Sequence, residues 1–198
     1  MITTRQFFVK RVMDLTLASL GLIVTIPLML LLVLVVYVFV GENGLFVQKR
    51  IGQYGEEFNI IKIRSLYAKK EFLSFSCFLR KSKLDELPQL WNVLVGEMSM
   101  VGPRPDLEGF ADKLKGEDRI VLVVKPGITG PASLYFYDEA RFFNNVKKNK
   151  EVTEKLLWKK KIKINKKYIK EYSLKKDIGY VFKTLLLVLI NLKNNPSV

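Results

Sequence analysis

Hydrophobic positions divide the chain into one unbroken apolar stretch and a series of shorter periodic segments. From Leu15 to Val40 the sequence LTLASLGLIVTIPLMLLLVLVVYVFV contains no charged residue over 26 positions. A helix needs roughly 20 apolar residues to cross a bilayer. The apolar region of a secretory signal is shorter, about 7–15 residues, and ends at a small-residue cleavage site, which this stretch lacks. The pattern therefore predicts a helix inserted in a membrane.

The path of this helix depends on Pro27, which lies near its middle. A proline inside a helix removes one backbone hydrogen bond and bends the helix axis. Basic residues, which favour the cytoplasmic side of a membrane, flank both ends of the apolar stretch: Arg5, Lys10, Arg11, Lys49 and Arg50. The residues leave two arrangements open: a straight span, as in many membrane helices with proline, and a re-entrant helix with both ends in the cytoplasm.

Shorter periodicities follow the glycine-rich turn at 41–44. The segments 45–47 and FNIIKIR (58–64) have strand character and predict a small hairpin. In AKKEFLSFSCFLRKS (68–82), Phe72, Phe75, Phe78 and Leu79 recur at helical spacing among lysines. This predicts an amphipathic helix, either in a membrane interface or against the core. The apolar stretch at 178–192 is short for a span and predicts a surface-lying or core helix.

A further helix is predicted to begin at Ser82, a good N-cap, with Asp85 at its third position. Pro88 lies in its first turns. Its apolar face would consist of Leu84, Leu87, Leu90, Trp91 and Leu94. The fold class is therefore mixed α/β, dominated by helices, with one small sheet.

Charge and composition narrow the chemistry. With 33 Lys plus Arg against 19 Asp plus Glu, the formal charge is +14, which favours polyanionic partners. The single cysteine, Cys77, rules out an internal disulfide framework. No histidine is present, which removes the usual general base, the usual metal ligand and every Ser-His or Cys-His nucleophile. Chemistry must then rest on carboxylates, Lys, Arg, Tyr or a hard metal ion.

Candidate chemistry lies in an acidic pair and two stiff loops. Asp85 and Glu86 are adjacent, and the simplest explanation is that acids favour the positive end of a helix dipole. A carboxylate can also attack phosphorus, and a second one can hold Mg²⁺. Arg104 lies between two prolines that stiffen its backbone, and the glycine-rich loop KPGITG (125–130) follows. Fixed arginines bind phosphate oxygens.

The segment LDELPQLWNVLVGEMSMVGPRP (84–105) resembles the central signature of the bacterial sugar transferases, the monotopic polyprenyl-phosphate phosphoglycosyl transferases. The resemblance continues in QKRIG, FNIIKIRSLY, KPGITG and YIKEYSLKKDI, in the family's order. It covers most of the chain from Lys10 to about Thr184. The length of the chain indicates the small, minimal form of the family.

The resemblance implies a role for each matching residue. Asp85 would attack the β-phosphate of a UDP-sugar, releasing UMP and keeping a phosphosugar on the aspartate. Glu86 would bind Mg²⁺. Polyprenyl (undecaprenyl) phosphate would then take the phosphosugar and start assembly of a surface glycan (O-antigen, capsule, exopolysaccharide or glycoprotein glycan). Substrate phosphate would be held by Arg104, Lys62, Arg64, Lys125, Gly127 and Thr129.

The resemblance also implies a setting. Residues 1–41 would form a re-entrant helix broken near Pro27, and residues 42–198 a membrane-associated catalytic domain on the cytoplasmic side of the bacterial inner membrane. The expected partners are anionic lipid, polyprenyl phosphate, UDP-sugar and downstream glycosyltransferases, with no nucleic acid.

The chain departs from the family pattern after KPGITG. Many relatives reach an Asn-Gly-Arg segment there, whereas this chain continues with PASLYFYDEA (131–140), and Arg141 is the nearest substitute. Ile26 also precedes Pro27, where relatives often have serine.

Two other functions compete with this interpretation. A basic, membrane-anchored nucleic-acid or scaffold protein would explain 14 Lys plus Arg against three acids between Arg141 and Lys176. A solvated helix face near anionic lipid explains the same lysines. An inactive relative is the other alternative, and the presence of Asp85, Glu86 and Arg104 argues against it.

Overall fold

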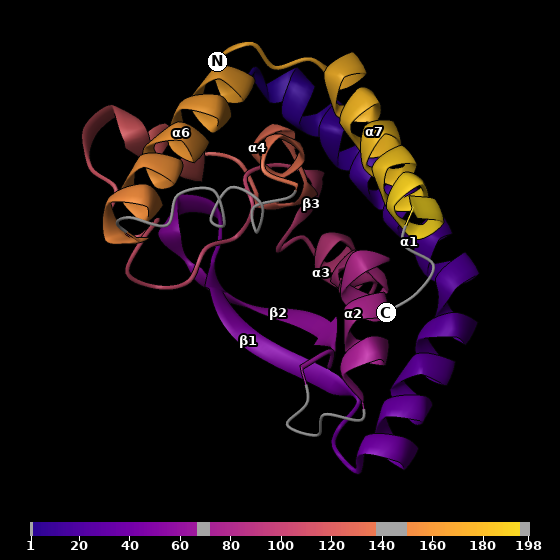
Figure 1. The fold of residues 1–198 in the computed structure, drawn as a ribbon. Coiled ribbons are helices and arrows are strands. Elements are labelled where there is room, and N and C mark those ends of the chain that lie inside the picture. Colours follow the sequence, from indigo (N-terminus) through magenta and orange to yellow (C-terminus); the bar gives the residue numbers. More distant parts are fainter. Residues whose placement is uncertain (1, 67–71, 138–149, 195–198) are drawn as a thin grey trace.

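Helices dominate the computed structural model, which describes residues 2–66, 72–137 and 150–194. Two small two-stranded sheets lie among them, one antiparallel and one parallel (Figure 1). The prediction of a helix-dominated mixed fold is confirmed, although the second sheet was not predicted.

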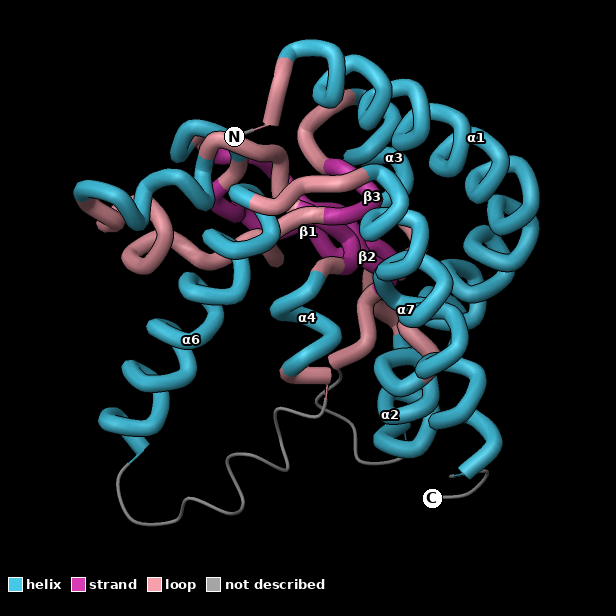
Figure 2. The backbone as a smooth tube through the Cα atoms, turned by 90° about the horizontal axis from the view of Figure 1, so that it is seen from above, coloured by secondary structure: helices cyan, strands magenta, loops and turns pink. Residues whose placement is uncertain are grey.

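The predicted membrane helix is α1, Thr4–Val35, which continues as a π-helical turn, Val36–Val40. Thr3 caps its start in a capping box with Gln6, and Gly41 ends it with a left-handed backbone. Pro27 lies inside the helix, and the two views show α1 changing direction along its length (Figures 1 and 2). By length and composition Thr4–Val40 suffices to cross a membrane, and little of it is buried.

The predicted hairpin is confirmed as β1, Leu45–Ile51, and β2, Glu57–Ile63. The strands are antiparallel, with Leu45 opposite Ile63 and Ile51 opposite Glu57. In an antiparallel pair, residues directly opposite each other lie on the same face. Ile60 and Ile63 of β2 are buried and attach the hairpin to the rest of the domain.

The amphipathic helix predicted from the phenylalanines is α2, Leu73–Lys81. Leu79 is fully buried, and Phe72 and Phe75 pack against the same cluster as the second half of α1. Phe78 remains about half exposed. The helix therefore uses most of its aromatic face for packing within the protein.

The prediction that a helix begins at Ser82 is wrong for its first turns. The Ser82 hydroxyl donates to the carbonyls of Phe78 and Leu79, so this residue ends α2 rather than capping a new helix. A 3-10 turn follows at Leu84–Glu86, and helix α3 is Gln89–Val95, with Pro88 as its N-cap. Trp91 is about half exposed and does not belong to the buried face.

Strands β3, Ser99–Val101, and β4, Gly127–Thr129, form the parallel sheet. Their loops approach so closely that a Cβ on Gly127 would lie 2.1 Å from the Gly102 nitrogen. Only glycine permits this contact. The remaining helical elements of the described residues are the 3-10 turns Gln53–Gly55 and Gly116–Leu122, α4 Pro131–Tyr135, α6 Lys150–Lys170 and α7 Leu174–Asn194.

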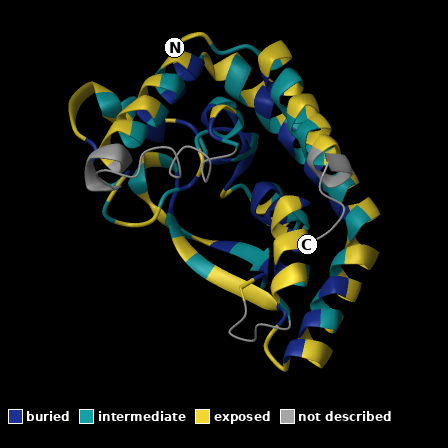
Figure 3. Cartoon of the chain, viewed as in Figure 1, coloured by how far each residue is buried: buried dark blue, intermediate teal, exposed yellow. Residues whose placement is uncertain are grey.

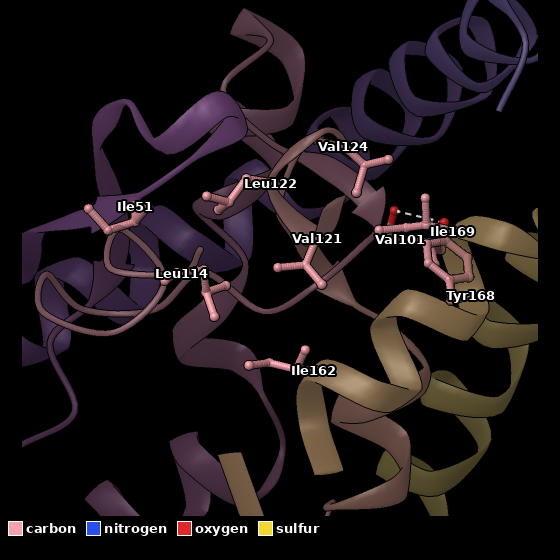
Figure 4. Packing of buried hydrophobic residues seen from close by; sticks show 10 residues of the cluster. Ile51, Val101, Leu114, Val121, Leu122, Val124, Ile162, Tyr168 and Ile169 are labelled. Carbon is pink, nitrogen blue, oxygen red and sulfur yellow. Dashed lines mark hydrogen bonds between the residues drawn. The ribbon is translucent and has the colours of Figure 1, made fainter. Parts of the chain in front are cut away.

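The main core lies where β1, β3, the 3-10 turn Gly116–Leu122 and α6 meet (Figure 4). Val101 and Ile169 are at its centre. By contrast, α7 shows a mostly exposed apolar face (Figure 3), formed by Ile178, Phe182, Leu185, Leu186, Leu189 and Ile190. The predicted C-terminal helix is therefore confirmed as a surface helix.

Candidate active site

The acidic pair lies on the 3-10 turn between α2 and α3. Lys83, just before the turn, has a left-handed backbone with φ of 58°, which is uncommon for a residue with a side chain. This local conformation redirects the chain after α2. Both acids end up buried, with Asp85 8% and Glu86 7% exposed.

Glu86 is surrounded by cations. Its Oε1 accepts a hydrogen bond of 2.8 Å from Arg104 Nη2, and the ammonium groups of Lys62 and Lys83 lie at 3.5 and 4.0 Å. Burial alone would raise the pKa of Glu86. The positive charges of Arg104, Lys83 and Lys62, with the Arg104 hydrogen bond, outweigh burial and lower the pKa from 4.5 to about 2. Glu86 is therefore ionised at neutral pH.

Asp85 has a different environment. One carboxylate oxygen, Oδ2, accepts a hydrogen bond of 3.1 Å from the Ser65 hydroxyl. The other, Oδ1, is buried and has no hydrogen-bond partner among the described residues. Burial, followed by the negative charge of Glu86, raises the pKa of Asp85, while the Ser65 hydrogen bond opposes that rise. Two adjacent carboxyls with pKa values pushed apart are typical of sites in which the two groups have different tasks.

Ser65 is itself held in place. Its backbone carbonyl accepts a hydrogen bond from the Ser76 hydroxyl on α2. Both serines are buried. The end of the hairpin, α2 and the acidic turn therefore form one connected unit around Asp85.

The hairpin contributes two cations on one face. Arg50 on β1 lies opposite Phe58, and Lys62 on β2 lies opposite Phe46, so their side chains leave the same face. Arg50 donates to Gln48, and its buried Nε has no partner among the described residues. Burial lowers the pKa of Lys62, and burial and the nearby charge of Arg104 lower the pKa of Arg50. Such closely spaced cations indicate a site for an anion.

Arg104 reaches Glu86 from the loop after β3. That loop is fixed by backbone hydrogen bonds to β4: Gly102 donates to Thr129 at 2.9 Å, and Gly127 donates to Pro103 at 2.8 Å. The glycine-rich loop thus supports the arginine through its backbone. Gly127 and Thr129 were predicted to bind phosphate, and in the structure their backbones support the loop that carries Arg104. The Thr129 hydroxyl is hydrogen-bonded to the Thr184 hydroxyl at 2.6 Å.

Two of the cations predicted to bind substrate phosphate, Arg64 and Lys125, make their contacts with other residues than the acidic pair. Arg64 donates to the Asn43 carbonyl at 2.8 Å and pairs with Glu42 at 3.3 Å, at the base of the hairpin. Lys125 lies beside Arg11, and burial followed by the Arg11 charge lowers its pKa. Arg141, considered as a substitute for the family arginine, lies outside the described residues. Of the predicted site residues, the structure therefore brings together Asp85, Glu86, Arg104 and Lys62.

Sequence reasoning missed Ser65, Lys83 and Arg50 as members of the site. Ser65 and Arg50 lie within segments that resemble the family's motifs, so position alone could have indicated them. Lys83 lies three positions before Glu86, and this spacing alone could have indicated their proximity on a helical turn.

Mg²⁺ is the metal ion that the resemblance to the sugar transferases implies. Among the residues that the structure describes, no group of three or more His, Cys, Asp or Glu is placed to hold a metal ion. Mg²⁺ is often bound by one or two carboxylates together with substrate phosphates and water. The ionised carboxylate of Glu86 is a donor of that kind. The residues present therefore fit a metal ion that arrives with a diphosphate.

The comparisons with known proteins decide the family. The model of the family described as Bacterial sugar transferase matches residues 5–191, which is nearly the whole chain. The chain belongs to the bacterial sugar transferase family. This bacterial sugar transferase is also similar to individual curated proteins of larger size.

A Xanthomonas campestris pv. campestris protein named UDP-glucose:undecaprenyl-phosphate glucose-1-phosphate transferase is 34% identical over 197 residues, which are 91% of this chain and 38% of that protein. An Aeromonas hydrophila protein named UDP-N-acetylgalactosamine-undecaprenyl-phosphate N-acetylgalactosaminephosphotransferase is 30% identical over 203 residues, 92% of this chain and 44% of that protein. The chain thus spans about two fifths of the length of these relatives. Their names specify different sugars, so they leave the sugar of this chain open.

Proposed function

We propose that this bacterial sugar transferase moves a sugar-1-phosphate from a UDP-sugar to polyprenyl (undecaprenyl) phosphate, releasing UMP. The names of the relatives support the substrates. The main structural support for this function is that the two adjacent acids have different environments. Asp85 has a buried oxygen with no hydrogen-bond partner in the described part of the chain, while Glu86 is ionised by three surrounding cations.

In the first step, Asp85 Oδ1 attacks the β-phosphorus of the UDP-sugar. A bond forms between this oxygen and phosphorus, and the bond from phosphorus to the oxygen bridging the α-phosphate breaks. The electron pair leaves with UMP, and the sugar phosphate remains on Asp85. Such covalent catalysis replaces one difficult step with two easier ones. Ser65 holds Oδ2, so Oδ1 is the oxygen that remains available.

In the second step, an oxygen of polyprenyl phosphate attacks the same phosphorus and displaces the Asp85 carboxylate. The product is polyprenyl-diphosphate-sugar, and Asp85 is regenerated. The product would start a surface glycan, and downstream glycosyltransferases would use it.

Cations of the site stabilise the transferred phosphate. Arg104, Lys62, Lys83 and Arg50 supply fixed positive charge where negative charge accumulates on the phosphate oxygens. Mg²⁺, when held by Glu86 and the diphosphate, would neutralise charge on the leaving phosphate. The cations already around Glu86 keep this carboxylate ionised and therefore able to accept a metal ion.

The setting is part of the same proposal. Residues 1–41 form a re-entrant helix bent near Pro27, and residues 42–198 form the catalytic domain at the cytoplasmic face of the bacterial inner membrane. The exposed apolar surface of α1 and the lysines of α6 support contact with lipid, because apolar residues enter the bilayer and lysines attract anionic headgroups.

Isotope exchange tests the covalent step. Radiolabelled UMP and a UDP-sugar substrate are incubated with the enzyme in the absence of polyprenyl phosphate. A covalent intermediate predicts that label enters the UDP-sugar, since the first step is reversible without the acceptor. Transfer that proceeds normally with acceptor, yet shows no exchange without it, would rule out the intermediate.

A further inference from the structure

The first turns of α1 carry charged side chains that are buried inside the protein rather than directed to solvent. Lys10 is 4% and Asp14 1% exposed. The Lys10 ammonium pairs with Asp177 Oδ2 of α7 at 2.7 Å and donates to the Val101 carbonyl of β3 at 2.8 Å. One end of the membrane helix is therefore bonded directly to the strand that leads to Arg104.

Asp14, one helical turn further on, holds the same strand. Its Oδ1 accepts hydrogen bonds from the Ser99 hydroxyl at 3.0 Å and from the Met100 backbone nitrogen at 2.9 Å. Lys10 and Asp14 lie on one face of α1 because residues four apart are neighbours on a helix. Together they contact every residue of β3, which ends three positions before Arg104.

Arg11 connects α1 to the other half of the site. Its guanidinium donates to the carbonyls of Val93 and Leu94 at 2.7 and 2.9 Å, at the C-terminal end of α3. A cation there satisfies carbonyls that the helix leaves unbonded. Helix α3 begins three residues after Glu86, so its position determines where the acidic turn lies.

The buried ion pair is costly if its only task is attachment. Removing two charges from water carries a large desolvation penalty, and apolar residues of similar volume often stabilise a protein as well or better. Here the pair also satisfies a backbone carbonyl of β3 and is reinforced by the Tyr168 hydroxyl, which donates to Asp177 Oδ1 at 2.8 Å. Tyr168 and Asp177 belong to the motif YIKEYSLKKDI, which the proposed reaction does not otherwise use.

We propose that Lys10, Arg11 and Asp14, here called the α1 clamp, are positioning residues that hold Arg104 against Glu86. Lys10 and Asp14 fix β3 and the arginine loop, and Arg11 fixes α3 and the acidic turn. The membrane helix is then a structural part of the catalytic site as well as an anchor. The inference rests on the proposed function, because it assumes that Arg104 binds the diphosphate of the donor.

The test measures UDP binding by titration calorimetry, with the full chain in detergent and Mg²⁺ present. Lys10→Met with Asp177→Leu removes both buried charges together and leaves neither one unpaired, which favours a folded protein. Arg104→Lys is then made in the wild-type and in this background. The matched control is Lys166→Met with Asp118→Leu, which removes a partly exposed pair at 2.8 Å between α6 and the 3-10 turn Gly116–Leu122.

Coupling between the two sites is the result expected. Arg104→Lys weakens UDP binding by about tenfold or more in the wild type and in the control background, but by less than about threefold when the Lys10–Asp177 pair is absent. A folding defect unrelated to Arg104 would instead leave the two losses equal. Ser99→Ala, which removes one Asp14 hydrogen bond and no charge, gives the same cycle with milder coupling of about threefold.

Two results would overturn the inference, and they have different meanings. Equal losses in all backgrounds would show that the α1 clamp does not position Arg104, while the proposed reaction would stand. No loss from Arg104→Lys in the wild type would remove the phosphate-binding role of Arg104 itself, and with it both the inference and that part of the proposed function.

Discussion

Arg104→Gln tests how the site keeps Glu86 ionised. In the folded protein the pKa of Glu86 falls from 4.5 to about 2. This difference of roughly 2.5, at about 1.36 kcal/mol for each pKa unit, corresponds to about 3 kcal/mol of stability at pH 7. Arg104 is the largest of the favourable contributions. Losing it is expected to remove much of that stabilisation.

The sign of the pH dependence follows from the direction of the pKa change. Because the folded-state pKa lies below its ordinary value, the stabilisation is fully present above pH 4.5 and is lost as the pH falls towards 2. The difference in unfolding free energy between wild type and Arg104→Gln should therefore be up to about 3 kcal/mol at pH 7 and no more than about 1 kcal/mol at pH 3.

Urea denaturation of the purified protein in detergent, followed by tryptophan fluorescence at both pH values, measures this difference. Lys49→Gln is the matched control, because its pair with Glu57 is largely exposed and is expected to contribute little at either pH. A large loss of stability that is the same at pH 7 and pH 3 would show that Arg104 stabilises the fold without acting on the charge of Glu86.

Ser65→Ala should lower kcat about tenfold by releasing Asp85, with Ser65→Thr retaining activity, and an unchanged kcat would contradict this. Pro27→Ala should favour a straight span, detected by cysteine labelling from each side of the membrane. Gly127→Ala should destabilise the protein by several kcal/mol in thermal unfolding, whereas Gly179→Ala, with open space around its Cβ and helical backbone, should not.

The hairpin and the helices α2 and α7 could be predicted because local sequence patterns are enough to indicate the type of each element, whether its apolar face is buried, as in α2, or exposed, as in α7. The segment 58–64 contains three isoleucines, which favour strands, and Ile178–Leu192 keeps one apolar face at helical spacing. The helix start predicted at Ser82 was wrong, although serine is a favourable N-cap residue because its hydroxyl can accept a hydrogen bond from the first turn of a helix. Its hydroxyl instead bonds back to Phe78, a choice that depends on where α2 ends.

The centre of the site could be predicted from the resemblance, and its details could not. Asp85, Glu86, Arg104 and Lys62 do meet in the structure. The sequence could not show that Arg64 turns away to Glu42, since that depends on the turn before β1. It also could not show that Ser65 selects one oxygen of Asp85, because that contact joins residues 20 positions apart.

The most direct measurement is release of UMP by the purified enzyme with Mg²⁺, polyprenyl phosphate and a panel of UDP-sugars, comparing wild type with Asp85→Asn. The wild type should release UMP from at least one donor and the variant none above background, because the amide cannot act as the nucleophile. Tryptophan fluorescence and binding to liposomes show that the variant is folded and attached to membranes. Full UMP release by Asp85→Asn would contradict the assignment of Asp85 as the nucleophile.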